Sequence, residues 1–456
     1  MKKQENKSKI KIQNIIIVIN IVILLAITCF YAYRLIHFYR IENPKIDKQT
    51  TLSEAITMKK NITSIGDGLY KKKDTYTYKG KEVNNYLEYS GYLFRIISVD
   101  EDDNVKVITD DAITNLAWGI DDNYEKSYIK IWLTGENEHE GIFYNSLNNA
   151  LNYLVDTSFC TETVDEDVKK CKDNTTDKVG LLSLDEYKEV GGSKSYLNKD
   201  NYWWLSNPSE DGIWYVYSDG KINDVSNSGN EYYSYGVRPV ITIKGDTKLI
   251  SGDGTLKNPY TIEKDTGNML KDKSVGKYIK YSDLTWRIIE KNDSYVRVAL
   301  DGFIKEDNED YERVYSNNLT TYSSTNAIGY YLNYMFYETL DHSYMVDGTI
   351  YTNRYDSTVD FNYLKLFSSS ITAKVGMMQV GDLFMNDYSD YFLVSRTSTY
   401  VGTVYRVLED NKLYADLPTS KAKIRPTIFL DLDSPIKSGS GTKEKPYVIG
   451  DIDEEK

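Results

Sequence analysis

The longest apolar run of the chain lies close to its N-terminus. Residues 12–33 contain no charged side chain and consist mainly of Ile, Val and Leu. A helix of about 20 residues crosses the ~30 Å hydrocarbon core of a bilayer, so this run is long enough to span a membrane. Lysines crowd the segment before it, whereas Arg34 and Arg40 follow it. By the positive-inside rule, the pattern predicts a single-pass signal anchor, with residues 1–11 in the cytoplasm and the C-terminal domains outside the cell.

A cleaved signal peptide is the alternative interpretation of this segment. The apolar stretch is longer than the hydrophobic region of a usual signal peptide, and no small-x-small cleavage site follows it. We therefore expect residues 12–33 to stay in the cell membrane and residues 34–60 to form a linker.

Beyond the anchor, the apolar positions follow the shorter periods of strands and a few helices. Segments such as YLFRIISVD and VKVIT run apolar or alternate, with many β-branched residues, which is typical of strands. Residues 144–157 and 326–340 space their apolar positions as helices do, and residues 183–186 form a capping box that opens a short helix. Strands, two helices and further strands in this order predict an α+β fold with mixed, mostly antiparallel sheets.

Six blocks of sequence occur twice, in the same order along the chain. The paired blocks are 85–113 with 277–304, 150–159 with 331–340, 178–187 with 374–383, 202–207 with 391–396, 236–243 with 423–430, and 251–262 with 438–449. A period this long indicates duplicated domains rather than a solenoid. We therefore predict two tandem copies of one domain, at 61–263 and 264–450.

Charge and composition narrow the classes of function. The formal net charge is −13, which argues against a nucleic-acid partner because phosphate binding needs clustered Lys and Arg. The chain has only 3 His, which leaves little material for His-based metal sites or general-base chemistry. Tyrosine, with 42 residues, is the unusual component.

Two cysteines, Cys160 and Cys171, lie beyond the membrane segment. In an oxidising compartment such a pair is typical of a disulfide that closes a short loop. Two free thiols in a polar insertion are the alternative.

Four arginines stand inside apolar strand sequences at matching places in the two copies: Arg95 with Arg287, and Arg238 with Arg425. An arginine among Phe, Trp and Ile is costly to bury alone, so we expect each to pair with a carboxylate or with carbonyl groups. Their predicted role is structural.

Three short motifs resemble those of a known family. They are YWWLSN at 202–207, YVYSDG at 215–220 and GVRPV at 236–240. The first copy resembles a bacterial surface-protein domain family of largely unknown function, which is similar to the formylglycine-generating-enzyme branch of the C-type-lectin-like fold. The resemblance implies two tandem C-type-lectin-like domains, each with two short helices and a ligand-binding face rich in loops. The second copy keeps Arg425-Pro426 but has Phe392-Leu393 in place of the tryptophan pair.

The resemblance also raises the question of catalysis. Formylglycine-generating relatives use a reactive cysteine pair late in the domain, and this chain has no cysteine after Cys171. No nucleophile elbow, HExxH or Walker A motif occurs either. Calcium-dependent sugar binding by such folds uses a Glu-Pro-Asn loop that is also missing, so the oxygen-bearing side chains near residues 219–230 are expected to be solvated turns. The sequence favours a protein without catalytic residues, metal or cofactor, and a formylglycine-generating type of enzyme remains an alternative.

Aromatic residues crowd the segment from 202 to 235, interleaved with Ser, Asn and Gly. Such mixtures are typical of binding surfaces, because Tyr and Trp offer large and stiff contact area. The predicted ligand-binding residues are Trp203, Trp214, Tyr217, Tyr232, Tyr233 and Tyr235. We expect Trp204 and Tyr215 to lie partly in the core, and the three tyrosines of 232–235 to be exposed.

These expectations together predict a membrane-anchored extracellular protein that binds a protein or glycan ligand through the first copy. The alternative is a structural spacer or scaffold of a cell-envelope complex that binds nothing through this face.

Overall fold

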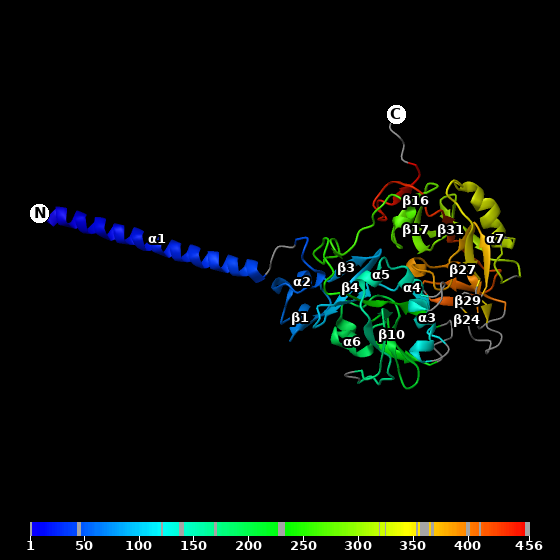
Figure 1. The fold of residues 1–456 in the computed structure, drawn as a ribbon, viewed down its shortest axis with the longest axis horizontal. Helices are drawn as coiled ribbons and strands as arrows, with labels where there is room; N and C mark the ends of the chain where they lie inside the picture. The colour runs from blue at the N-terminus through cyan, green and yellow to red at the C-terminus, as the bar shows by residue number, and fades with distance from the viewer. Residues whose placement is uncertain are drawn as a thin grey trace, which may run out of the picture.

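The computed structural model describes residues 2–42, 47–119, 122–135, 141–167, 171–226, 233–318, 320–323, 325–352, 354–355, 364–365, 369–397, 402–409 and 412–451. It shows one long N-terminal helix and a globular part of mixed α and β structure (Figure 1). We call residues 47–263 the first half of the globular part and residues 264–451 the second half.

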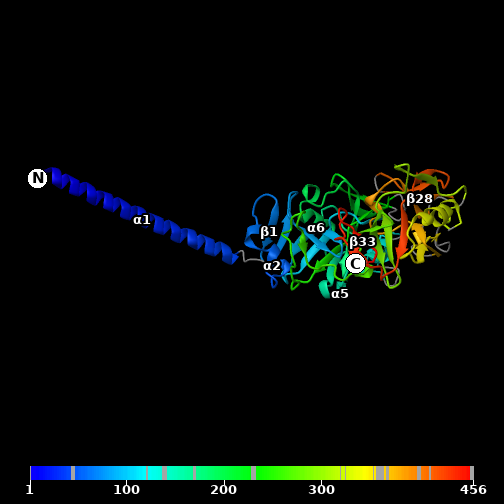
Figure 2. The same ribbon diagram turned by 90° about the horizontal axis from the view of Figure 1, so that it is seen from above.

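The N-terminal helix α1 (Lys2–Glu42) stands away from the globular part (Figures 1 and 2). Its stretch Asn14–Arg40 contains an 18-residue window with a mean hydropathy of 2.8 and is exposed, so it is long and apolar enough to cross a membrane. The apolar run predicted over 12–33 therefore lies within one helix, which continues beyond that run.

Packed structure begins earlier than the sequence predicted. Helix α2 (Leu52–Ile56) starts at a capping box in which Thr51 and Glu54 satisfy each other's backbone N–H groups. Leu52 and Ile56 are completely buried. The segment predicted as a linker over 34–60 thus already contributes to the core of the first half.

The described residues of the first half form two principal sheets and a hairpin of β7 (Thr157–Cys160) with β8 (Asn174–Asp177). The larger has the order β1-β2-β4-β5-β14-β9, and β3 joins β4 to β15. Its strands are β1 (Gly68–Lys72), β2 (Thr75–Lys79), β3 (Tyr86–Tyr89), β4 (Tyr92–Val99), β5 (Val105–Thr109), β9 (Val179–Gly180), β14 (Val240–Ile243) and β15 (Tyr260–Thr261). The smaller sheet has the order β12-β11-β10-β13-β6 and consists of β6 (Thr114–Leu116), β10 (Trp203–Pro208), β11 (Ile213–Val216), β12 (Ile222–Val225) and β13 (Tyr235–Val237).

The second half also contains two principal sheets. The larger has the order β26-β31-β18-β17-β16-β33-β32, with β16 (Tyr278–Tyr281), β17 (Leu284–Lys291), β18 (Val296–Leu300), β26 (Val375–Met377), β31 (Pro426–Leu430), β32 (Ile436–Ser438) and β33 (Tyr447–Ile449). The smaller has the order β21-β30-β27-β28-β29, with β21 (Glu312–Val314), β27 (Tyr391–Arg396), β28 (Val404–Val407), β29 (Leu413–Asp416) and β30 (Lys421–Lys423).

The strand order of the two halves can be compared directly. In the larger sheets, β9-β14-β5-β4-β3-β15 has the same sequence of neighbours as β26-β31-β18-β17-β16-β33. Each half is closed by one parallel pair, β15 with β3 and β33 with β16. The smaller sheets share a parallel pair as well, β10 with β13 and β27 with β30. The hairpin β1–β2 is the principal addition in the first half.

One pairing of sequence blocks does not fit these strands. Leu154 bridges Ile243 at the end of β14, and Met345 bridges Leu430 at the end of β31. Leu154 therefore occupies the place of Met345, whereas pairing 150–159 with 331–340 had matched it to Met335. The prediction for this block was wrong. It matched residues of similar type on helical turns that do not correspond in the structure, and it did not take account of the strands beside them. Met335 is 53% exposed, while Leu154 is fully buried.

The predicted helices fare differently in the two halves. In place of the helix predicted over 326–340, residues 327–339 form one continuous helical segment made of α7 (Ala327–Tyr330), a π-helical turn (Tyr331–Phe336) and a 3₁₀ turn (Tyr337–Thr339). The helix predicted over 144–157 is instead two short helices, α4 (Ile142–Asn145) and α5 (Ala150–Tyr153). Asn149, in the left-handed region at φ 51°, separates them. The other helices of the first half are α3 (Tyr128–Thr134) and α6 (Leu184–Glu189), the latter opening at the predicted capping box.

The two halves share one hydrophobic core. The indole N–H of Trp132 in α3 donates to the carbonyl of Gly381 at 2.7 Å, and the Tyr92 ring stacks on Phe384 with centroids 5.5 Å apart. The backbone N–H of Phe384 donates to the carbonyl of Ile113 at 2.6 Å. The two halves are therefore packed against each other as a single body and are not merely joined by a linker.

Candidate functional site

The strand that carries the tryptophan pair is buried on both of its faces. Trp203 and Trp204 are adjacent in β10, and neither side chain is exposed. On one face, Trp203 meets the Tyr187 ring edge-on and lies 4.6 Å below the Arg238 guanidinium. On the other face, Trp204 packs against the rings of Tyr215 and Tyr235 and donates its indole N–H to the carbonyl of Leu116 at 2.8 Å. The tryptophan pair therefore belongs to the core.

Beside Trp204, four tyrosines form what we call the tyrosine cluster: Tyr202, Tyr215, Tyr217 and Tyr235. Ring centroids are 4.5 Å apart for Tyr215 and Tyr235, 5.1 Å for Tyr215 and Tyr217, and 5.2 Å for Tyr202 and Tyr217. Tyr233 meets Tyr235 edge-on at 6.2 Å. Aromatic pairs at these separations gain energy beyond the burial of their area, so the cluster is a stiff unit.

The structure corrects part of the predicted ligand-binding set. Trp203, Trp214 and Tyr235 are buried, with Tyr235 only 5% exposed, because β13 pairs with both β6 and β10 and turns the Tyr235 ring inward against Trp204. The expected exposure of Tyr235 was therefore wrong. Tyr217 and Tyr233 are half-buried and keep one edge toward solvent, whereas Tyr232 lies outside the described residues.

The open edge of the tyrosine cluster faces the second half. The ammonium of Lys412 lies 4.3 Å from the ring centre of Tyr202 and 5.6 Å from that of Tyr235. The backbone N–H of Leu413, at the start of β29, donates to the hydroxyl of Ser234 at 3.0 Å. A cation over aromatic faces is a favourable contact, so the second half already occupies part of this surface.

Hydrogen bonding within the cluster separates the acidities of its tyrosines. Burial raises the pKa of Tyr215 to about 12. The hydroxyl of Tyr215 donates to that of Tyr217, and this bond, together with Asn223 and the charge of Lys412, lowers the pKa of Tyr217. The Tyr217 oxygen already accepts from Tyr215 and Asn223, so its own O–H is the group at the accessible edge that can donate a hydrogen bond to a ligand.

The four arginines bind chiefly to fixed groups of the fold. Arg238 is fully buried and donates to the carbonyls of Thr109, Asp110 and Leu197 at 2.5–3.1 Å. Arg95 donates to the side chains of Asn85 and Asp110. In the second half, Arg425 donates to the carbonyls of Leu300 and Phe384, and Arg287 donates to Gly276 and pairs with Asp387 at 2.7 Å. Each arginine ties several backbone segments together.

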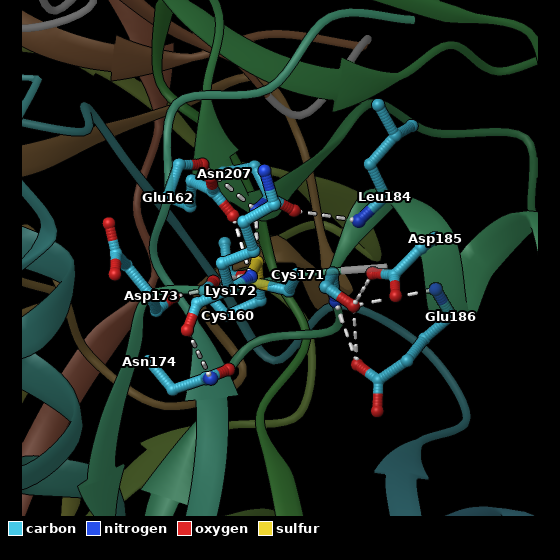
Figure 3. Close-up of a disulfide and its surroundings, with 12 residues drawn as sticks. Cys160, Glu162, Cys171, Lys172, Asp173, Asn174, Leu184, Asp185, Glu186 and Asn207 are labelled. Atoms are coloured by element: carbon cyan, nitrogen blue, oxygen red, sulfur yellow. Dashed lines mark hydrogen bonds between the residues drawn. A yellow bond between two sulfur atoms is a disulfide. The ribbon is translucent and has the colours of Figure 1, made fainter. Parts of the chain in front are cut away.

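A disulfide joins Cys160 to Cys171 beside the tryptophan strand (Figure 3). The Asn207 amide donates to the Cys160 sulfur at 2.8 Å and to the carbonyl of Glu162 at 3.2 Å, while its oxygen accepts the backbone N–H of Leu184 at 2.8 Å. Asn207 thereby connects β10, the disulfide loop and the start of α6. The motif YWWLSN contains this asparagine, but spacing alone gave no sign of its role.

No group of three or more His, Cys, Asp or Glu side chains able to hold a metal ion occurs within the described ranges. Several recesses in the described part of the chain do contain charged side chains. One, of about 420 Å³, lies in the first half beside Glu186, another, of about 390 Å³, lies between the halves beside Glu88 and Lys277, and a third, of about 570 Å³, lies between the halves beside Glu290.

Comparison with protein families gives a match to the part of the chain that contains the tyrosine cluster. Residues 54–245 match a family model. The family is described as a domain of unknown function, DUF6273. No curated protein and no solved structure matches the chain.

The DUF6273 match covers the tryptophan strand, the disulfide and the tyrosine cluster. It ends before the closing strand β15 and before the whole second half, which includes Lys412. The residue that covers the cluster thus comes from outside the matched region.

Proposed function

We propose that the chain is a membrane-anchored binding protein whose globular part lies outside the cell and recognises a protein or glycan ligand. The observation that carries the proposal is the tyrosine cluster, whose partly exposed edge is formed by Tyr202 and Tyr217, with Tyr233 beside it. Stiff aromatic rings with hydroxyl tips stack on sugar rings and on peptide groups at little cost in conformational entropy.

The organisation of the globular part supports an interpretation as two tandem C-type-lectin-like domains. The strand orders of the larger sheets agree, and the parallel closures by β15 and β33 occupy equivalent places. Pairing between an N-terminal and a C-terminal strand of each domain is what the lectin-like resemblance implies. In this proposal the second copy has diverged and serves to cover and shape the ligand face of the first.

The proposed topology rests on the charges around α1. Lys2, Lys3, Lys7, Lys9 and Lys11 precede the apolar stretch. Lysine-rich flanks stay in the cytoplasm, which directs the globular part outward. A disulfide between Cys160 and Cys171 is at home in the oxidising environment outside the cell.

A glycan array and a cell-surface pull-down with the full chain in detergent test the proposal. Replacing Tyr217 and Tyr233 together by alanine should abolish the signal in whichever assay is positive. Tyr330 and Tyr334 supply the matched control, because they are a stacked and exposed tyrosine pair on the helix of the second half. Their double replacement by alanine should leave binding intact. Equal loss in both double variants would refute a role for the tyrosine cluster.

A structural spacer is the second candidate, and one observation favours it. Lys412 already lies over the cluster and Leu413 is hydrogen-bonded to Ser234, so the surface has an internal occupant. Silence of the full chain in both assays would favour the spacer. Binding that increases on replacing Lys412 by alanine would favour the binding protein, with the second half as a cover.

A further inference from the structure

The recess beside Glu290 lies between the two halves. One wall of this cavity of about 570 Å³ comes from α4 of the first half. The second half supplies the end of β17 and the turn after it, strand β22 (Gly348–Tyr351) and the loop before Phe384. The lining side chains that matter below are Ile289, Glu290, Tyr295, Thr349, Tyr351 and Asp382. A cavity of this size with mixed polar and apolar walls can hold a small organic ligand.

Asp382, one of the charged residues that line the cavity, forms a bidentate ion pair with Arg297. Arg297 is fully buried, and its two terminal nitrogens donate to the two carboxylate oxygens of Asp382 at 2.8 and 2.9 Å. Asp382 also accepts the backbone N–H of Gln379 at 2.7 Å. This bidentate geometry neutralises Asp382 and leaves it little capacity for a ligand.

The carboxylate of Glu290 lacks the short hydrogen bonds that Asp382 receives from Arg297. Its carboxylate has only long contacts, at 3.4 Å to Arg297, 3.2 Å to the Tyr295 hydroxyl and 3.4 Å to the Asn292 amide. One guanidinium thus serves two carboxylates, so the group of three carries a net negative charge. The ammonium of Lys291 donates instead to the carbonyls of Lys271 and Lys273 at 3.0 Å each. The Glu290 side chain remains 33% exposed.

The first half shows that the fold does not require this extra carboxylate. There, Lys106 pairs with Glu186 at 2.5 Å, and Ser98 faces Lys106 across the strands as Glu290 faces Arg297. The same β-bulge precedes both positions. Ser98 is also paired to Thr77 of β2, whereas no described strand pairs with Glu290 on that side. The second half therefore combines open space with a carboxylate that its counterpart lacks.

From this combination we propose that the cavity between the halves binds a small ligand that carries one primary ammonium group on an apolar body. The ammonium donates to Glu290, while Tyr295, Tyr351 and Ile289 contact the apolar body. Charge-assisted hydrogen bonds of this kind are among the stronger ones, especially where water is partly excluded. This site is separate from the tyrosine cluster and does not rest on the function proposed above.

Three probes of one shape test the proposal: benzylamine, benzyl alcohol and benzoate. Ligand-observed NMR would measure their affinities for the full chain in detergent at physiological salt. Benzylamine should bind more tightly than the other two by roughly tenfold or more, which is what one charge-assisted hydrogen bond contributes. Glu290→Gln should remove the preference, whereas Glu338→Gln, an exposed carboxylate outside the cavity, should leave it unchanged.

A second variant separates loss of the site from loss of the fold. Thr349→Trp fills the cavity from β22 without touching the carboxylates, so it should abolish benzylamine binding while the melting temperature stays close to that of the wild type. The proposal is overturned if benzylamine binds no better than benzyl alcohol. It is equally overturned if the preference survives either Glu290→Gln or Thr349→Trp in folded protein.

Discussion

The two halves should unfold as one cooperative unit, and Trp132 gives the sharpest test of this. Trp132 belongs to α3 of the first half, is fully buried, and donates its indole N–H to Gly381 of the second half at 2.7 Å. Its ring also stacks against Phe143 at 6.3 Å. Replacing a buried Trp by Ala costs about 3–5 kcal/mol through lost burial and the remaining cavity. We therefore expect Trp132→Ala to weaken both the first half and its attachment to the second.

The size of the effect follows from the size of the unit. For a single unit of about 400 residues, the entropy of unfolding is about 0.8 kcal/mol per kelvin, so a loss of 3–5 kcal/mol lowers Tm by about 4–6 °C. Differential scanning calorimetry of the full chain in detergent should show one transition for the wild type, with calorimetric and van't Hoff enthalpies that agree. In Trp132→Ala, the transition should broaden or split, because the contact that couples the halves is lost.

Trp118→Ala is the matched control. Trp118 is equally buried, but its ring contacts lie within the first half, on Tyr124 and Trp204. This variant should lower Tm by a similar amount while the transition stays single. Two separate transitions in the wild type, or identical peak shapes in the two variants, would refute the idea of one coupled body.

Three further outcomes follow from the described contacts. The Cys160–Cys171 disulfide closes a loop with a sequence separation of 11, so Cys160→Ser with Cys171→Ser should lower stability by about 3 kcal/mol, seen as a lower melting temperature that no longer responds to reductant. Arg238→Met should cost about 3 kcal/mol or more in urea unfolding, since it removes the donor from the buried carbonyls of Thr109 and Leu197 and from the part-buried carbonyl of Asp110. Burial, with Asp382 adding to it and Arg297 opposing it, raises the pKa of Glu290. Because the folded-state pKa lies above the unfolded value, the wild type should gain stability relative to Glu290→Gln as pH falls through the folded pKa, and a gain on raising the pH instead would contradict this.

Much of the strand pattern could be predicted from the sequence, because each strand is marked by local features. The apolar runs of β4 and β17, the acidic turns that follow them and the Arg-Pro pairs at the N-terminal ends of β14 and β31 can all be recognised in the sequence. The match of Leu154 with Met335 failed, because it compared helical turns by residue type alone. Strand partners far away in sequence, such as Ile243 for Leu154, decide such positions, and they are not local information.

The candidate site was harder to predict for the same reason. Alternation along β10 implied that one tryptophan of the pair faces outward, but a second layer covers that face, so Trp203 and Trp204 are both buried. Tyr235 was predicted to be exposed, but it lies in β13, which pairs with strands on both sides. Lys412 and Tyr202 are in contact although they lie about half the chain apart in sequence. The sequence near either residue does not predict this contact.

The parallel pair of β15 with β3 has a consequence for how such a chain can grow. Tyr260 lies beside Leu87 of β3, and Thr51 bridges Lys248, so the polypeptide leaves the first half close to where it enters it. A unit whose entrance and exit are neighbours can be copied, inserted or removed without rethreading anything else. Lengthening the molecule then needs only a new surface to meet the old one, and residues such as Phe384 and Lys412 show what that meeting requires.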